Sequence, residues 1–283
     1  MRYDLAAMAK RAKPGMRRKA VTMRDIPPPA TLATDLYRAA YAPLVDLWTR
    51  NGDSIAADYA RTLAALTTDS PADLQTQLDA ADGAFDRLFI LLRAGLEGWA
   101  VQTERYQRSK WRGAVLSASG VDITTLIGPE DVRETVQTYV NWNVALIKDI
   151  HSETRKRIGN AVFAGLQNRS PAREVAATIR ESVAMSKRRS MLVASDQLSK
   201  LSSALADERR REAGIETWEW KWSHKKHGRA EHIARDGHVY SDVKTRIGTV
   251  VDGKTVEQSP EEFQLPGRLP YCGCRSLAVL TWD

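Results

Sequence analysis

The sequence predicts a mainly α-helical protein, with long helices first and a small α+β domain with a few short strands at the C-terminal end. Between residues 31 and 213, apolar residues recur every three to four positions, which is the spacing of one helix face. After Gly214 the pattern changes to alternating aromatic and polar residues separated by glycine and proline. The composition, 43% hydrophobic and 27% charged, is that of a folded globular protein.

The predicted organisation has three parts. Residues 1–30 form a basic tail with a proline-rich spacer, and residues 31–154 form a helical region. Residues 155–283 form the C-terminal domain, with helices over 155–214 and short strands over 215–283. A core shared by so few strands is thin for independent stability.

The basic tail holds the whole net charge of the chain. Residues 1–24 contain eight basic side chains and one acid, and the net charge of the chain is +7. Pro27, Pro28 and Pro29 follow as a stiff, non-helical spacer. Two interpretations stay open: a solvated, flexible tail, or an arm that contacts DNA phosphates without reading sequence. The expected DNA-contacting residues are Arg2, Lys10, Arg11, Lys13, Arg17, Arg18, Lys19 and Arg24.

Proline and glycine divide the helical region. Residues 31–66 are helical, with a kink or break at Pro43 and a turn at Asn51-Gly52. A long helix begins at Ser70-Pro71, and a second long helix follows Gly128-Pro129. Their apolar stripes are broader than a short helical domain buries by itself, so we expect them to form an interface with a partner.

The helical pattern continues to Gly214. A short helix is expected over 172–183 after Ser170-Pro171, and a separate basic helix over 186–213. Gly214 ends it in the C-terminal capping role. Strands are expected over 217–222, on both sides of Asp252-Gly253, and over 276–282.

The sequence contains no membrane or secretion signal. No apolar run approaches the roughly 20 residues that cross a bilayer, and the N-terminus is too charged for a secretory signal. With two cysteines, a disulfide-rich secreted scaffold is not expected. We therefore expect synthesis in a cytoplasm and no membrane partner.

Four histidines and both cysteines lie after residue 217, and they suggest a zinc site. The ligand set would be Cys272, Cys274, His232 and either His227 or His224, with His227 taken for the fourth. The alternative is no cofactor: His232 hydrogen-bonds within its turn, and the thiols pack under Trp220 or Trp222. A Cys272–Cys274 disulfide would be strained at this spacing.

A metal-dependent nuclease is the alternative function for this His- and Cys-rich region. Such chemistry needs carboxylates or histidines around a metal and a general base, for which Asp236 and His238 are candidates. Asp236-Gly237 is better explained as a turn. No phosphate-binding loop or nucleophile elbow is present. We therefore expect no enzymatic activity and no catalytic residues.

Short motifs occur in a fixed order along the last 130 residues. They are a helix beginning at Ser170, a basic helix ending at Gly214, and the residues Trp220, Arg229, His232, Asp236, Gly237, Cys272, Cys274 and Arg275. In this order the chain resembles the phage minor head proteins of the Mu protein F-like head morphogenesis family. The resemblance covers residues 155–280. The chain departs from the family pattern at residues 194–197 and 224–227.

The resemblance implies a minor capsid protein that acts in head morphogenesis. Its expected partners are the portal protein, the scaffold or major capsid protein, and DNA without sequence specificity. Its expected location is the virion, inside the head near the portal vertex, and the host cytoplasm during assembly. The helical region 31–154 would then face the portal or the head interior.

Overall fold

A computed structural model describes residues 2–15, 18–65 and 70–282. They form two compact units, each built from separate stretches of the chain. Unit 1 contains residues 1–30, 101–138 and 196–283, and unit 2 contains residues 31–100 and 139–195. Among the described helices, none is long and apolar enough to cross a membrane.

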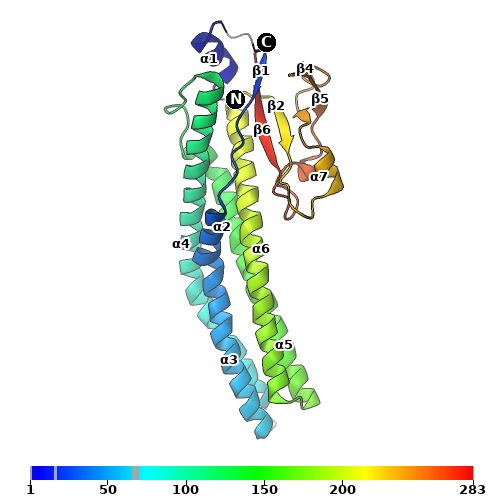
Figure 1. Cartoon of the computed structure of the whole chain (residues 1–283). Helices are drawn as coiled ribbons and strands as arrows, with labels where there is room; N and C mark the ends of the chain where they lie inside the picture. Colours follow the sequence, from blue (N-terminus) through cyan, green and yellow to red (C-terminus); the bar gives the residue numbers. More distant parts are fainter. Residues whose placement is uncertain (1, 16–17, 66–69, 283) are drawn as a thin grey trace. The chain divides into compact units, whose positions relative to one another are not determined.

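Long helices and short strands alternate with turns, which confirms the predicted fold class (Figure 1). The α-helices are α1 (Leu5–Ala12), α2 (Ala30–Leu36), α3 (Ala42–Ala64), α4 (Ser70–Ser119), α5 (Arg133–Asn168), α6 (Ala172–Glu212) and α7 (Ala230–Ala234). A π-helical turn spans Tyr37–Tyr41, and 3-10 turns span Glu130–Val132 and Glu262–Gln264. The strands are β1 (Ala20–Thr22), β2 (Thr217–Lys221), β3 (Val239–Ser241), β4 (Val250–Val251), β5 (Lys254–Gln258) and β6 (Arg275–Thr281).

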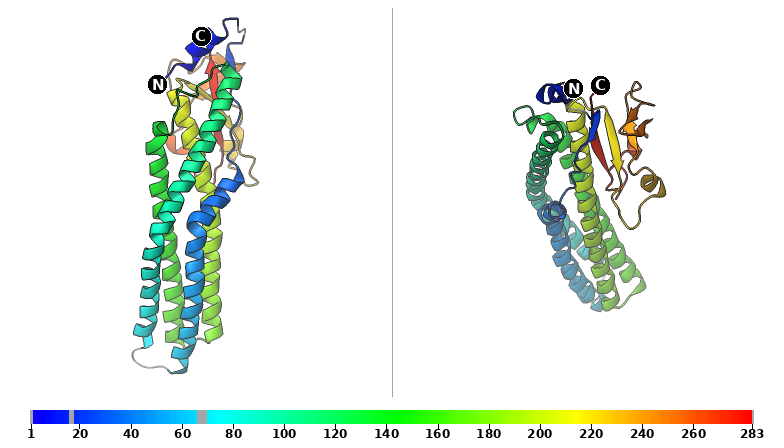
Figure 2. Two further views of the ribbon diagram at one scale, coloured as in Figure 1. Left: turned by 90° about the vertical axis from the view of Figure 1, so that its left-hand side faces the viewer. Right: turned by 45° about the horizontal axis from the view of Figure 1, so that its top comes forward.

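Unit 2 is a helical bundle whose members are joined by buried side-chain hydrogen bonds (Figure 2). The Tyr41 hydroxyl donates to Asn143 Oδ1 at 2.8 Å, which joins the π-helical turn to α5. Trp48 Nε1 of α3 donates to His151 Nδ1 of α5 at 3.1 Å. These bonds satisfy buried polar atoms, and they fix which helix faces meet.

The apolar stripes of α4 and α5 are largely buried within unit 2. Leu78, Leu92 and Ile147 are each at most 1% exposed. A stripe that is already buried offers little area to a partner. From the sequence we expected the broad stripes to form an interface with a partner. Because the stripes are buried within unit 2, their breadth does not by itself indicate such an interface. The exposed apolar side chains of α4 in this unit are Ile90 and Leu91.

Unit 1 contains a six-stranded sheet in the order β1-β6-β2-β3-β5-β4. All neighbouring strands are antiparallel except the parallel pair β3–β5. In β2 and β6, Trp218 pairs with Ala278. β1 pairs with β6, so the first and last of the described strands are neighbours in one sheet, as Figure 1 shows.

The N-terminal segment is folded, so the prediction of a flexible tail is wrong for residues 2–15 and 18–24. In α1, Leu5 and Ala9 are fully buried, and they belong to a core cluster with Trp111, Val115 and Leu280. β1 pairs with β6 over three residues. The excess charge concealed the two apolar positions of α1, which are four residues apart and share one helix face.

A buried guanidinium joins three segments of unit 1. Arg209 of α6 is 1% exposed and forms ion pairs with Glu104 at 3.0 Å, Asp131 at 3.2 Å and Glu212 at 3.1 Å. Arg2 pairs with Asp131 and Glu212, which adds the N-terminal segment to the same network. Burial raises the pKa of Glu104, an effect that the neighbouring Arg108 and Arg209 oppose.

Two predicted breaks are absent. The turn at Asn51-Gly52 is wrong, because α3 continues through it: the Asn51 side chain donates to Leu47 O at 2.8 Å, and a Cβ at position 52 would lie 3.0 Å from Ile179. The separate helices 172–183 and 186–213 are the single helix α6. The Ser186 hydroxyl is satisfied within that helix, at Ser182 O. The expected disturbance at Pro43 corresponds to the π-helical turn that precedes it.

His151 makes the stability of unit 2 dependent on pH. Its Nδ1 accepts from Trp48, so Nε2 donates to Asp82 Oδ1 at 3.0 Å, and the imidazole is neutral. Burial lowers the pKa of His151, and the Asp82 carboxylate opposes this in part. The unfolded chain therefore binds more protons below about pH 6.5, and stability falls as the pH falls.

We expect the free energy of unfolding, measured with denaturant, to decrease between about pH 7 and pH 5. His151→Gln, which cannot titrate, should lose this component of the pH dependence while it keeps the remainder. The same pH dependence in both proteins would contradict the assignment.

Candidate functional site

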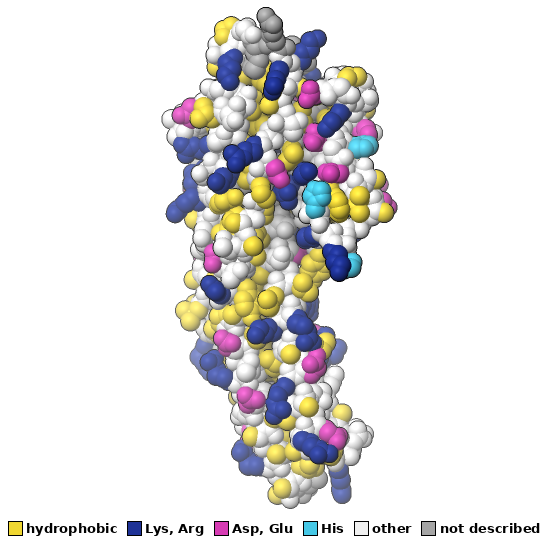
Figure 3. Space-filling model, in the orientation of Figure 1, with side chains coloured by type: hydrophobic (Ala, Val, Ile, Leu, Met, Phe, Trp, Pro, Cys, Tyr) yellow, Lys and Arg dark blue, Asp and Glu magenta, His cyan; other side chains and the backbone are white. Residues whose placement is uncertain are grey.

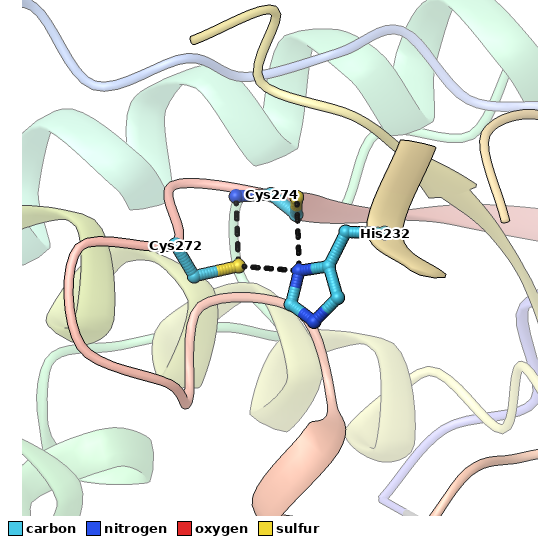
Figure 4. Close-up of side chains that lie close together, drawn as sticks. All are labelled: His232, Cys272 and Cys274. Carbon is cyan, nitrogen blue, oxygen red and sulfur yellow. Dashed lines mark hydrogen bonds between the residues drawn. The ribbon is translucent and has the colours of Figure 1, made fainter. Parts of the chain in front are cut away.

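The candidate site lies in unit 1, where α7 meets the loop that precedes β6 (Figure 4). His232 Nδ1 lies 3.2 Å from Cys272 Sγ and 3.7 Å from Cys274 Sγ. All three side chains are buried, and their ligand atoms lie within 4.8 Å of one another. Two sulfur atoms and an imidazole nitrogen are ligands suited to a soft metal ion such as zinc.

The backbone of the cysteine loop, which we define as residues 265–275, directs both sulfur atoms to one side. Tyr271 has φ of 59° and Gly273 has φ of 70°, so each cysteine lies next to a residue whose backbone is in the left-handed conformation. The Cys272 N–H donates to Leu269 O at 3.1 Å, and the Cys274 N–H donates to Cys272 Sγ at 3.4 Å. The one-residue spacing is thereby compatible with a shared site.

Helix α6 supports the cysteine loop through Asp196, a residue that sequence reasoning passed over. Asp196 Oδ1 accepts from the Tyr271 N–H at 2.5 Å, and Oδ2 pairs with Lys200 Nζ at 2.9 Å. Both charged side chains are at most 9% exposed. The signal in the sequence was an acid and a lysine four residues apart on one helix face. Their distance from the cysteines along the chain hid the connection.

Aromatic side chains form the floor of the site. Trp220 of β2 is fully buried, and its ring centroid lies 5.0 Å from that of His232 in an edge-to-face arrangement. Trp218, Tyr240 and both cysteines belong to the same apolar cluster. The thiols therefore pack in the same apolar cluster as the tryptophans, an arrangement that is compatible with metal binding.

The other motif residues hold the site together. Arg229 precedes α7 and donates to Pro270 O at 3.1 Å. Asp236 Oδ1 accepts from the Trp222 N–H at 2.8 Å, and the Gly237 N–H donates to Trp220 O at 2.8 Å. Arg275 forms a bidentate pair with Asp25, with bonds of 2.7 and 2.6 Å. Each of these contacts joins segments that are distant in the sequence.

The pKa values of the two thiols are shifted in opposite directions. Hydrogen bonding from the Cys274 thiol, opposed in part by burial, lowers the pKa of Cys272 to about 5. The same hydrogen bond, together with burial, raises the pKa of Cys274. These opposite shifts favour the thiolate form on Cys272 rather than on Cys274. No disulfide joins the two cysteines in the structure.

The remaining histidines lie outside this group of ligand atoms. His227 and His224 are exposed, and the His224 ring lies 4.5 Å from that of Trp222. His238 is exposed and pairs with Glu257 at 2.8 Å. The expected four-ligand set is therefore only partly assembled, because His227 is not part of the cluster that the described residues form. The nuclease candidates Asp236 and His238 also lie outside it, with partners of their own.

The predicted DNA-contacting residues differ in their surroundings. Arg2 is engaged with Asp131 and Glu212. Arg17 lies outside the described residues. The side chains of Lys10, Arg11, Lys13, Arg18, Lys19 and Arg24 are exposed. On the face drawn in Figure 3, Lys and Arg side chains are spread over the surface and do not form one patch.

Asp196→Ala should destabilise the protein by about 3–5 kcal/mol, the range for breaking a buried ion pair. The substitution removes the carboxylate partner of Lys200 and leaves the Tyr271 N–H without its acceptor. Glu208→Ala is the control, since its pair with Arg211 is largely exposed and should cost about 0–1 kcal/mol. Denaturant unfolding measures both. Equal effects would contradict the role given to Asp196.

Part of the chain, including the site, is similar to known proteins. Residues 156–277 match the model of the "Phage Mu protein F like protein" family. An uncharacterized protein of Haemophilus influenzae is 30% identical over 163 residues, which are 57% of this chain and 33% of that protein. The chain thus spans about a third of that relative's length. No solved structure matches the chain. The resemblance seen in the sequence is confirmed over residues 156–277, which match the model of the phage Mu protein F like family.

Proposed function

We propose that this chain is a minor capsid protein of a phage head, associated with the portal and in non-specific contact with DNA. The observation that carries the proposal is the family match over residues 156–277, which indicates a part in phage head morphogenesis. The proposed location is the head interior near the portal vertex, with the host cytoplasm during assembly. The proposed partners are the portal, the scaffold or major capsid protein, and DNA.

A structural rather than an enzymatic role agrees with the way the motif residues are used. Arg229, Asp236 and Arg275 bind backbone atoms or an acidic partner within unit 1, and Trp220 is fully buried. Side chains engaged in this way are not placed to act on a substrate. For the part of the family region that lies in unit 1, residues 196–277, we therefore propose a structural role in assembly.

We place the portal contact in unit 2, on its exposed apolar residues. Ile90 and Leu91 of α4 are adjacent and are 74% and 69% exposed. Large apolar side chains at this exposure are candidates for a protein interface. Both lie outside the family region, in the part of the chain for which we predict the portal-facing role.

The full-length protein should therefore co-purify with the cognate portal protein, and Ile90→Ser with Leu91→Ser should reduce this at least tenfold. Because both side chains are exposed, the variant should keep the melting temperature of the wild type. Val101→Ser with Leu116→Ser is the matched control, since these residues of α4 are 52% and 51% exposed in unit 1. Equal loss in both variants, or no portal binding by the wild type, would overturn the assignment.

The DNA contact is proposed for the exposed cations of residues 10–24. Because α1 and β1 belong to the fold, deleting this segment would also remove buried residues. Substitution of Lys10, Arg11, Arg18 and Lys19 by Gln removes charge without that loss. Each phosphate contact contributes about 0.9 to the slope of log affinity against log salt, so the slope should fall by about 3–4.

Fluorescence anisotropy with duplexes of unrelated sequence, over a series of salt concentrations, measures this slope. The matched control replaces four exposed cations of unit 2 by Gln: Arg87, Arg173, Arg180 and Lys187. An unchanged slope in the first variant, or an equal change in the control, would refute the proposed DNA surface.

A further inference from the structure

The cluster of His232, Cys272 and Cys274 brings three metal-ligating side chains together in an apolar surrounding. Its neighbours are apolar, and the cluster lies against Trp220 in the core of the strand-rich part of unit 1. Its three donor groups converge on one point, as Figure 4 shows, and no carboxylate belongs to the group of described ligand atoms. A buried pair of thiols beside an imidazole is the ligand chemistry of structural zinc.

We propose that His232 Nδ1, Cys272 Sγ and Cys274 Sγ bind one Zn²⁺ ion, which joins α7 to the cysteine loop. The fourth coordination position would be open to a water molecule. This site is independent of portal or DNA binding, and the ion serves to stabilise the module rather than to catalyse a reaction.

The distances between the donor atoms fit this ion. With Zn–S near 2.3 Å and Zn–N near 2.0–2.1 Å, a tetrahedral site has a sulfur-to-nitrogen distance of about 3.6 Å. The two observed sulfur-to-nitrogen distances, 3.2 and 3.7 Å, lie on either side of this value. The sulfur-to-sulfur distance of such a site is about 3.8 Å, and the ligand atoms lie within 4.8 Å of one another, so an ion would require movements of at most about an ångström.

Surrounding contacts already hold the ligands in place. The Cys274 N–H points at Cys272 Sγ, a bond that favours the thiolate form that binds metal. Asp196 accepts a hydrogen bond from the Tyr271 N–H, and Arg229 at the start of α7 donates one to Pro270 O. The Ser223 hydroxyl donates to Cys272 O at 3.0 Å. These bonds fix the loop before any metal arrives, which lowers the entropy lost on binding.

The donor set also selects the metal. Two thiolates and an imidazole suit zinc, whereas magnesium and manganese prefer carboxylate and water oxygen. This selection separates the proposed site from that of a magnesium-dependent nuclease. A bound ion would also stabilise this region, because an ion that binds only the folded state adds its binding free energy to that of folding.

The test uses the full-length protein purified without chelator and, separately, refolded with zinc. Mass spectrometry of metals should find about one zinc per chain in the wild type. Cys272→Ser, Cys274→Ser and His232→Asn should each lose it. His227→Asn and His238→Asn are the matched controls, because these side chains are exposed and outside the cluster, and they should keep it.

Two measurements on the wild type keep the test decisive if the cysteine variants fail to fold. Cobalt in place of zinc should give a sulfur-to-metal charge-transfer band, and zinc should slow alkylation of both thiols at least tenfold. No bound zinc after refolding, together with unchanged alkylation, would overturn the proposal. Loss of zinc in His227→Asn as in His232→Asn would overturn the three-ligand assignment.

Discussion

The buried guanidinium of Arg209 is the interaction on which unit 1 depends. An isolated charge in an apolar interior costs several kcal/mol, so Arg209 is tolerable only with its acidic partners in place. Those partners come from α4, from the turn before α5, and from α6 itself. Arg2 then attaches the N-terminal segment to two of the same carboxylates. The network makes segments far apart in sequence fold together.

The candidate site also depends on contacts between segments that are distant in the sequence. The cysteine loop has little regular structure, and it takes its position from α6 through Asp196 and from α7 through Arg229. β6, which follows the loop, pairs with β1 from the opposite end of the chain. The family region is therefore completed by residues outside it, and its motif is largely a set of contacts that hold this arrangement.

Much of the architecture follows from local sequence. The period of apolar residues located α4, α5 and most of α6, and Gly214 marked the end of α6. Alternating aromatic residues located β2, and Asp252-Gly253 located the turn between β4 and β5. The ordered motif identified the family, and three of the four expected metal ligands lie together. These features depend on neighbours within a few residues or on residue type, which the sequence states directly.

The sequence by itself determined the helices, the strand-rich end and the residue types of the site. Only the tertiary structure decided that residues 2–15 and 18–24 join the fold, because burial of Leu5 and pairing of β1 need partners from the other end of the chain. It likewise brought Asp196 to the cysteine loop and left His227 outside the cluster. Contacts of this kind depend on how distant segments approach one another, and no local period or charge count records that approach.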